Sequence, residues 1–196
     1  MSDDLRRELD EHRAVAGQMD ALLPAIEKVA AAMIDALSHT GRVIAFGNGG
    51  SAADAQHLVA ELVGRTRRER GALPALALSA DSSTVTALGN DYGFADVFAR
   101  QVSAHARAGD VVVGISTSGA SENIVRGLQA AKRMGASTVL LGGAEGGPAA
   151  SAAKMTILVP SRTAARIQEI HTLIIHLLCE RIDAWASSAE GPAISQ

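Results

Sequence analysis

The sequence predicts an α/β fold, in which helices sandwich a five-stranded parallel sheet and a helical extension precedes it at the N-terminus. After Gly41, short apolar runs alternate with longer amphipathic stretches, the order typical of βαβ units with right-handed crossovers. The composition is 47% hydrophobic but only 3% aromatic, which indicates an interior of Ala, Val, Leu and Ile, as expected for a parallel sheet covered on both faces. The 196 residues are most simply one structural domain.

The predicted elements follow in chain order. Two helices come first, over residues 3–18 and 21–39, and apolar side chains recur at helical spacing in the second. Five apolar runs are strand candidates: 42–46, 74–79, 111–115, 138–142 and 155–159. Helices are predicted around them over 52–64, 82–89, 95–106, 121–134, 147–153 and 164–187. The chain therefore divides into a helical extension over residues 1–40 and an α/β domain over residues 41–188.

The helix predicted over residues 121–134 has sequence signals at both ends. Ser121 can cap its N-terminus. Lys132 and Arg133 suit the negative end of a helix dipole, and Gly135 then stops the helix.

The helical extension must bury its apolar stripe somewhere. It can fold over one face of the sheet, or it can pack against the same element of a second copy of the chain. Because closed oligomeric symmetry is common among small α/β proteins, we expect the extension to form an oligomer interface.

Charge and composition narrow the partners and the compartment. A formal net charge of −3 gives no reason to expect nucleic acid or an acidic membrane as a partner. The one cysteine, Cys179, cannot form an intramolecular disulfide, and its apolar helical context is typical of core residues. The charged start lacks the apolar stretch of a secretory signal, and no run of about 18 apolar residues could span a membrane. We therefore expect a cytoplasmic protein.

Two strand-to-helix junctions have the composition of phosphate-binding loops. The first is Gly47-Asn48-Gly49-Gly50-Ser51, and the second is residues 116–121 (Ser-Thr-Ser-Gly-Ala-Ser). In open α/β sheets, ligands bind outside the carboxyl ends of the strands, where these loops lie. Glycines let the backbone approach an anion, and free N–H groups at the start of a helix donate to it. The two loops together favour a phosphorylated small molecule as ligand.

Either loop alone has other interpretations. A connection rich in Gly and Ser is often only a tight turn. Residues 47–52 also match the G-x-G-x-x-A pattern of dinucleotide sites, although Asp81 lies further along the chain than the acidic residue of such sites. The sequence contains no G-x-x-x-x-G-K-[ST], which argues against a P-loop nucleotide enzyme.

Four side chains from two distant helices are candidate metal ligands. His57 and Glu61 lie four residues apart and so project from one helix face, although such a pair alone is more often a surface contact. Gln168 and His176 come from an otherwise apolar helix. Imidazole together with carboxylate or amide oxygen suits Zn²⁺, or a similar first-row ion, better than Mg²⁺. We therefore predict a zinc site built from both helices.

The spacing of Gln168 and His176 leads to a further expectation. Eight residues correspond to about 12 Å along a regular helix, a long reach for two side chains that bind one ion. The helix should therefore start late or bend, or a neighbouring subunit should complete the site. His171 is a competing ligand, which we interpret as a buried or supporting residue.

The remaining charged side chains near these residues have simpler interpretations. The basic stretch that follows Glu61 is expected to be a solvated loop able to steer an anionic substrate. It contains Arg65, Arg67, Arg68 and Arg70. Three further histidines are expected to be solvated: His12, His39 and His105.

Several segments, in this order and spacing, resemble the phosphoheptose isomerase family of the sugar isomerase (SIS) domain group. They are residues 47–57 (GNGGSAADAQH), 81–83 (DSS), 89–92 (GNDY), 116–119 (STSG) and 166–169 (RIQE). The resemblance extends over residues 20–186. Ala80 and Ala120 depart from residues common in the family, but both are loop positions and leave the metal residues intact.

This resemblance implies a flavodoxin-like SIS fold and a zinc-containing homotetramer. It implies conversion of sedoheptulose 7-phosphate to D-glycero-D-manno-heptose 7-phosphate, the first step of ADP- or GDP-heptose biosynthesis. One Zn²⁺ per subunit would be bound by His57, Glu61, Gln168 and His176. The implied substrate contacts are Asn48, Gly49, Gly50, Ser51, Glu61, Asn90, Asp91, Ser116, Thr117, Ser118, Ser121 and Gln168, with the serine loop taking the phosphate.

An isomerase of this kind must move one proton between C1 and C2 of the sugar and another between their oxygens. A carboxylate near the carbons can move the first proton through an enediol, and Glu61 is the candidate. His176 is the candidate acid for the oxygens. A metal ion would polarise the carbonyl group.

Two other functions stay open at this point. Some SIS proteins that resemble phosphoheptose isomerases are non-catalytic tetramers that bind the bacterial replication initiator protein. A sugar-phosphate sensor is a third interpretation, although the sequence contains no DNA-binding domain. The complete set of metal residues favours the enzyme.

Overall fold

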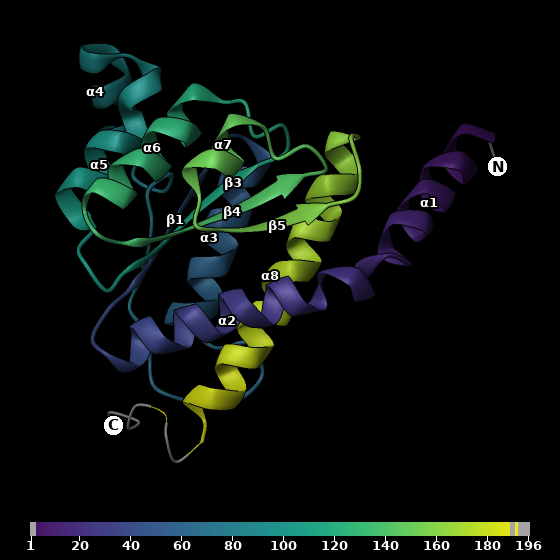
Figure 1. Cartoon of the computed structure of the whole chain (residues 1–196), viewed down its shortest axis with the longest axis horizontal. Coiled ribbons are helices and arrows are strands. Elements are labelled where there is room, and N and C mark those ends of the chain that lie inside the picture. Colours follow the sequence, from purple (N-terminus) through teal and green to yellow (C-terminus); the bar gives the residue numbers. More distant parts are fainter. Residues whose placement is uncertain (1–2, 189–190, 192–196) are drawn as a thin grey trace.

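The computed structural model describes residues 3–188 and 191, and within them a five-stranded parallel sheet lies between two layers of helices (Figure 1). The strands are β1 (Val43–Gly47), β2 (Ala75–Ala77), β3 (Val111–Ser116), β4 (Ser137–Gly143) and β5 (Met155–Val159). Their order in the sheet is β2-β1-β3-β4-β5, and every neighbouring pair is parallel. The predicted fold class is confirmed. The clearest difference is β2, which is shorter than the predicted run over 74–79.

Alternate side chains of each central strand point into two separate cores. Val111 and Val113 pack with α2 (Leu23–Ser38), α3 (Gly50–Val63) and α8 (Ala164–Ala186) on one face. Val112, between them, packs with α5 (Val97–His105), α6 (Glu122–Arg133) and α7 (Gly147–Ala152) on the other face. Burial on both faces explains why these strands read as continuous apolar runs in the sequence.

The helical extension follows the first of the two expected arrangements over most of its length. Its second helix, α2, lies across the sheet face beside α8 and buries Ile26, Val29 and Met33. Its first helix, α1 (Asp3–Ala16), projects from the body (Figure 1), and a 3-10 turn (Met19–Leu22) joins the two. On α1, Leu5 and Leu9 are 64% and 42% exposed. Whether this exposed part meets a second copy of the chain stays a prediction.

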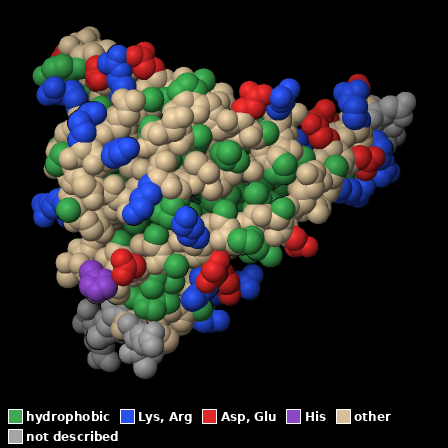
Figure 2. Space-filling model, viewed as in Figure 1, with side chains coloured by type: hydrophobic (Ala, Val, Ile, Leu, Met, Phe, Trp, Pro, Cys, Tyr) green, Lys and Arg blue, Asp and Glu red, His purple; other side chains and the backbone are tan. Residues whose placement is uncertain are grey.

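Polar contacts dock α1 onto the start of α8. The Arg166 guanidinium is largely buried and donates to the Glu8 backbone oxygen at 2.6 Å. The ring of His12 lies 2.7 Å from the Glu169 carboxylate. The expectation that His12 is solvated holds only in part: its side chain is 40% exposed, but it also has a partner 157 residues away in sequence that only the fold brings near. In the face drawn in Figure 2, acidic and basic side chains intersperse along α1 rather than forming a patch of one sign.

The remaining helix, α4 (Ser82–Tyr92), lies at a corner of the molecule and packs against α5 (Figure 1). The Asp81 carboxylate caps α4 by accepting hydrogen bonds from the backbone N–H groups of Ser83 and Thr84. Within residues 3–188, no helix combines the length and the apolar character needed to cross a membrane.

Helix α6 begins and ends where the sequence predicts, but only one of the two predicted end signals acts as expected. Gly135 follows the last turn with a φ of +79°, a conformation that favours glycine. Ser121 stands at the N-cap, yet its side chain makes no capping hydrogen bond. A loop hydroxyl that does not bond the first turn is available for another acceptor or donor.

Candidate functional site

The helices that carry the predicted metal ligands, α3 and α8, run side by side in the same direction. At their beginning Gly50 faces Gln168, because a Cβ on Gly50 would lie only 2.5 Å from the Gln168 Nε2. One turn further, the Thr172 hydroxyl donates to an oxygen of Asp54 at 3.2 Å. The two residues of each pair are 118 positions apart in the sequence, so α3 and α8 advance together with the same offset. Side chains one turn further along α3 therefore face side chains one turn further along α8.

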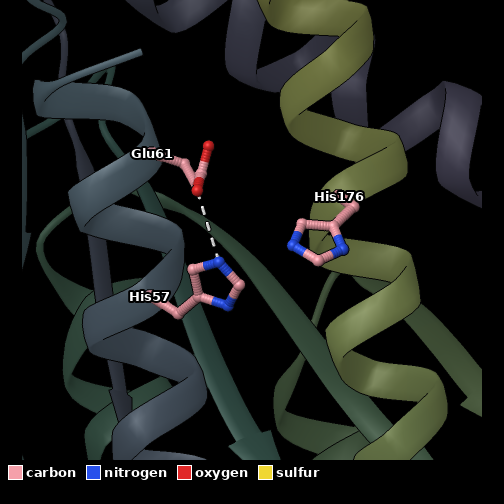
Figure 3. Close-up of side chains that lie close together, drawn as sticks. All are labelled: His57, Glu61 and His176. Carbon is pink, nitrogen blue, oxygen red and sulfur yellow. Dashed lines mark ion pairs between the residues drawn. The ribbon is translucent and has the colours of Figure 1, made fainter. Parts of the chain in front are cut away.

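His57 and Glu61 from α3 converge with His176 from α8 (Figure 3). One possible ligand atom from each residue lies within 4.8 Å of the others. The His57 Nε2 is 3.3 Å from the Glu61 Oε1, and the two imidazole rings lie edge to face with centroids 4.9 Å apart. Three of the four predicted metal ligands are thus brought together by one chain.

The arrangement of this triad fits a divalent metal ion. The second carboxylate oxygen of Glu61, Oε2, is buried and has no hydrogen-bond partner. A buried carboxylate oxygen without a hydrogen-bond donor lowers the stability of the fold, and a cation beside it would compensate for the lost hydration. Two imidazoles and one carboxylate are a ligand set that zinc accepts in catalytic sites, with a fourth position left for water or substrate. His176 is exposed, so the triad is open on one side.

Gln168 lies two turns before His176 on the same helix, against Gly50. The helix predicted over residues 164–187 is confirmed as α8, Ala164–Ala186, so of the three expected arrangements a late start of this helix does not apply. Ligation by Gln168 and a contribution from a second subunit both stay predictions.

A cleft of about 520 Å³ opens beside the triad. Glu61 and His176 form part of its wall, and the loop that follows α3 forms another part through Thr66 and Arg67. The rest of its lining is Leu173, Leu177 and Glu180 from α8. The site therefore has room for a small ligand next to the candidate metal position.

The two loops predicted to bind phosphate leave the sheet next to each other. Their strands, β1 and β3, are direct neighbours, and Gly47 pairs with Ile115 near the carboxyl ends. The strand order reverses between β1 and β3, which is the switch point where ligands bind in flavodoxin-like sheets. Asn48 and Asn123 exchange two side-chain amide hydrogen bonds, of 3.0 and 2.8 Å, that tie the first loop to α6.

The second loop is held by its own hydroxyls and by a close backbone contact. The Ser116 Oγ accepts a hydrogen bond from the Gly119 N–H at 3.0 Å, and the Ser118 Oγ accepts one from Ala120 at 3.2 Å. Gly119 has a φ of +63°, and a Cβ there would lie 1.9 Å from the Gly146 carbonyl oxygen. Only glycine fits this position. A cleft of about 230 Å³ adjoins the loop, lined by Thr117, Ser118, Ala144, Glu145, Ser161 and Arg162.

Asp54 is a site residue to which the sequence analysis gave no role. It lies on α3 between the first loop and His57, only 8% exposed, and its Oδ2 has no hydrogen-bond partner. Burial raises the pKa of Asp54, and the Thr172 hydroxyl and His57 offset part of that effect. Its signal in the sequence was its place inside the first loop-to-helix motif, three residues before His57.

Asn90 and Asp91 lie in the last turns of α4, and the Asn90 amide donates to the Asp91 carboxylate at 2.8 Å. This helix packs against α5, on the other side of the sheet from α3 and α8. A role of Asn90 and Asp91 in substrate binding stays a prediction.

Two interpretations of buried residues on α8 are confirmed. His171 is fully buried, with its Nε2 at 3.2 Å from the Gly142 carbonyl oxygen, and burial lowers its pKa to about 4. Cys179 is also buried, and burial raises the pKa of its thiol to about 12. Both belong to the packing of α8 on the sheet rather than to the open triad.

The basic stretch after α3 contains one clear exception to its predicted solvation. Arg70 has a side chain only 1% exposed, and its Nε donates to the equally buried Asp183 at 2.7 Å. The expectation was wrong for this residue because its partner lies 113 residues away on α8. Arg65, Arg67 and Arg68 are exposed, as expected.

Comparisons with known proteins agree with this geometry. The model of the SIS domain family matches residues 9–143. A phosphoheptose isomerase from Geobacter sp. (strain M21) is 49% identical over 93% of this chain and 96% of its own length. Solved structures of phosphoheptose isomerases are also similar. The protein from Neisseria gonorrhoeae has a TM-score of 0.88 and 41% identity, covering 93% of this chain and 98% of its own. The protein from Francisella tularensis has a TM-score of 0.90 and 37% identity, covering 94% and 100%.

Proposed function

This chain belongs to the SIS domain family and, within it, to the phosphoheptose isomerases, and we propose that it converts sedoheptulose 7-phosphate to D-glycero-D-manno-heptose 7-phosphate. It is thus a sugar-phosphate isomerase. One observation carries the proposal: His57 and Glu61, which lie two and three turns along α3 from the first phosphate-type loop, meet His176 of α8. The two turns to His57 correspond to roughly 10 Å, a distance that an open-chain heptose phosphate can span with its carbonyl end beside this histidine.

The metal centre in this proposal consists of His57, Glu61 and His176 of one chain and one Zn²⁺ per subunit, with Gln168 supplied as the fourth protein ligand at the contact with a neighbouring subunit. The orphaned Glu61 Oε2 and the two facing imidazoles support it. When bound, the ion would polarise the sugar carbonyl and stabilise negative charge that develops on its oxygen.

Glu61 and His176 carry the two proton movements. The Glu61 carboxylate lines the cleft and takes the proton from one of the two carbons, returning it to the other. His176, which is exposed and lines the same cleft, exchanges protons with the two sugar oxygens. Since the two groups come from different helices, the relative position of α3 and α8 decides whether both reach the same two carbons.

The two loops hold the rest of the substrate. The hydroxyls and backbone N–H groups of the second loop bind the phosphate, through Ser116, Thr117, Ser118 and Ser121. Other contacts come from Asn48, Gly49, Gly50, Ser51, Asn90, Asp91 and Gln168. Adjacent carboxyl ends of β1 and β3, with a glycine-rich turn on one and hydroxyl groups on the other, support this division.

We further propose a cytoplasmic homotetramer, in which the helical extension contributes to the contacts between subunits. Exposed Leu5 and Leu9 on the projecting α1 support an interface there. The product would enter ADP- or GDP-heptose biosynthesis.

The test is a coupled assay of sedoheptulose 7-phosphate turnover, with and without a metal chelator. We expect the chelator to abolish turnover and added Zn²⁺ to restore it. Glu61→Gln and His176→Gln should each lower kcat by a factor of about 10² to 10⁴. His39→Gln, at an exposed histidine on the end of α2, is the matched control and should retain full activity. Near-normal turnover by both site variants would refute the assignment.

A further inference from the structure

A buried ion pair joins the loop after α3 to the second half of α8. The Arg70 Nε donates to the Asp183 Oδ1 at 2.7 Å, and each side chain is 1% exposed. The other carboxylate oxygen of Asp183 accepts the backbone N–H groups of Arg67 and Arg68, at 3.0 and 2.8 Å. Burial alone would raise the pKa of Asp183, but these N–H groups and the guanidinium outweigh it and lower the pKa. The carboxylate is therefore charged and fully partnered.

The same guanidinium caps the C-terminus of α3. Its Nη2 donates to the Glu61 carbonyl oxygen at 2.7 Å, and its Nη1 donates to the Leu62 carbonyl oxygen at 2.8 Å. These are two of the last carbonyl groups of α3, which have no partner within the helix. A cation at this end of a helix also interacts favourably with its dipole. Arg70 therefore holds the backbone of Glu61 itself.

Asp183 lies on the helix that carries His176. The two residues are seven positions apart, so they share a face of α8 about two turns from each other. A continuous path thus runs from His176 along α8 to Asp183, through the Arg70 guanidinium, and into the peptide group of Glu61. Each link is a hydrogen bond of 2.7 Å or a rigid helix.

We propose that Arg70 and Asp183 are positioning residues for the metal centre, because they fix the distance between Glu61 and His176. This inference rests on the proposed function. The Arg70 cap keeps the last turn of α3 from fraying, and the Asp183 link sets that turn against α8. Without them Glu61 stays in the sequence but loses its fixed place opposite His176, and metal sites respond strongly to such losses.

The experiment must separate positioning from simple stability. Breaking one partner of a buried pair leaves an unpaired charge and destabilises the fold, whereas replacing both by apolar side chains of similar volume is often neutral or stabilising. We therefore choose the double variant Arg70→Met/Asp183→Leu, together with the conservative Arg70→Lys. The matched control is Glu27→Gln, which breaks an exposed ion pair between α2 and Arg181 of α8.

The readouts are Co²⁺ affinity and the visible absorption of the Co²⁺-loaded protein, both measured where circular dichroism reports folded protein. We expect the double variant to bind Co²⁺ about 10- to 100-fold more weakly, with shifted visible bands. The Co²⁺ affinity of Arg70→Lys should lie between those of the double variant and the unaltered chain. Glu27→Gln should have the same Co²⁺ affinity and spectrum as the unaltered chain.

Each other outcome has a distinct meaning. A folded double variant with unchanged affinity and spectrum would overturn the positioning role and leave the proposed function intact. If the unaltered chain bound no Co²⁺, the proposed metal centre would be wrong, and the positioning role with it. Unfolding of both Arg70 variants would also overturn the inference, because the pair would then serve folding alone.

Discussion

The buried imidazole of His171 makes a prediction about how stability depends on pH. His171 is fully buried on α8, and burial lowers its pKa from 6.5 to about 4. In the unfolded chain the imidazole takes up a proton as the pH falls through 6.5, whereas in the folded protein it stays neutral until about pH 4. The free energy of unfolding is therefore not reduced by this histidine above pH 6.5. It falls progressively as the pH is lowered from 6.5 toward 4, because the unfolded chain binds a proton that the folded protein does not.

The size of this effect follows from the two pKa values. The interval between 6.5 and about 4, at about 1.36 kcal/mol per pKa unit, corresponds to roughly 3 kcal/mol of stability lost by pH 4. Most of this loss has already occurred at pH 5, where the free energy of unfolding is about 2 kcal/mol lower than at pH 7. That is a large fraction of the 5–15 kcal/mol by which domains are typically stable.

The assay compares urea unfolding of the unaltered chain and of His171→Gln at pH 7 and at pH 5. A glutamine amide can still donate to the Gly142 carbonyl oxygen but does not titrate. We expect the unaltered chain to lose about 2 kcal/mol more than the variant between the two pH values. Comparing two pH values within each protein removes the constant cost of the substitution. A chelator and a fixed protein concentration are needed, because metal binding and association also shift stability. Parallel pH profiles of the two proteins would refute the reasoning.

Three further predictions concern single positions. Gly119→Ala should lower the free energy of unfolding by about 3 kcal/mol or more, because the new Cβ meets the Gly146 carbonyl at 1.9 Å; urea unfolding at the wild-type midpoint would contradict this. Gly50→Ala displaces the Gln168 amide and should raise KM for the sugar phosphate several-fold with little change in Tm; an unchanged KM would show that Gln168 does not contact substrate. Cys179, whose thiol pKa burial raises to about 12, should resist iodoacetamide at pH 8 when folded and react in urea, as measured by mass spectrometry; labelling of the folded protein would count against its burial.

The sheet could be predicted from sequence because each of its inner strands is buried on both faces. Runs such as Val111-Val112-Val113 are apolar at every position, and no other local structure explains their alternation with amphipathic helices. The limits of β2 were less accurate, because the apolar run over 74–79 continues past the point where the chain turns away after Ala77. The strand therefore pairs with β1 over three residues only.

The site was predictable where its geometry is local. The spacing of His57 and Glu61 on one helix follows from helical periodicity, and the loop compositions follow from the needs of an anion. Contacts between distant elements could not be derived in this way. The meeting of His176 with α3 depends on the register of two helices, and Arg70 looks solvated in sequence because Asp183, its partner, is 113 residues away.

The central claim is that His57, Glu61 and His176 of one chain hold a metal ion. Anomalous X-ray scattering at the zinc edge, from crystals grown with Zn²⁺, tests it most directly. The account predicts an anomalous peak about 2.0–2.2 Å from a nitrogen of each imidazole and from a carboxylate oxygen of Glu61. A peak elsewhere in the molecule, with these three side chains left without metal, would contradict it.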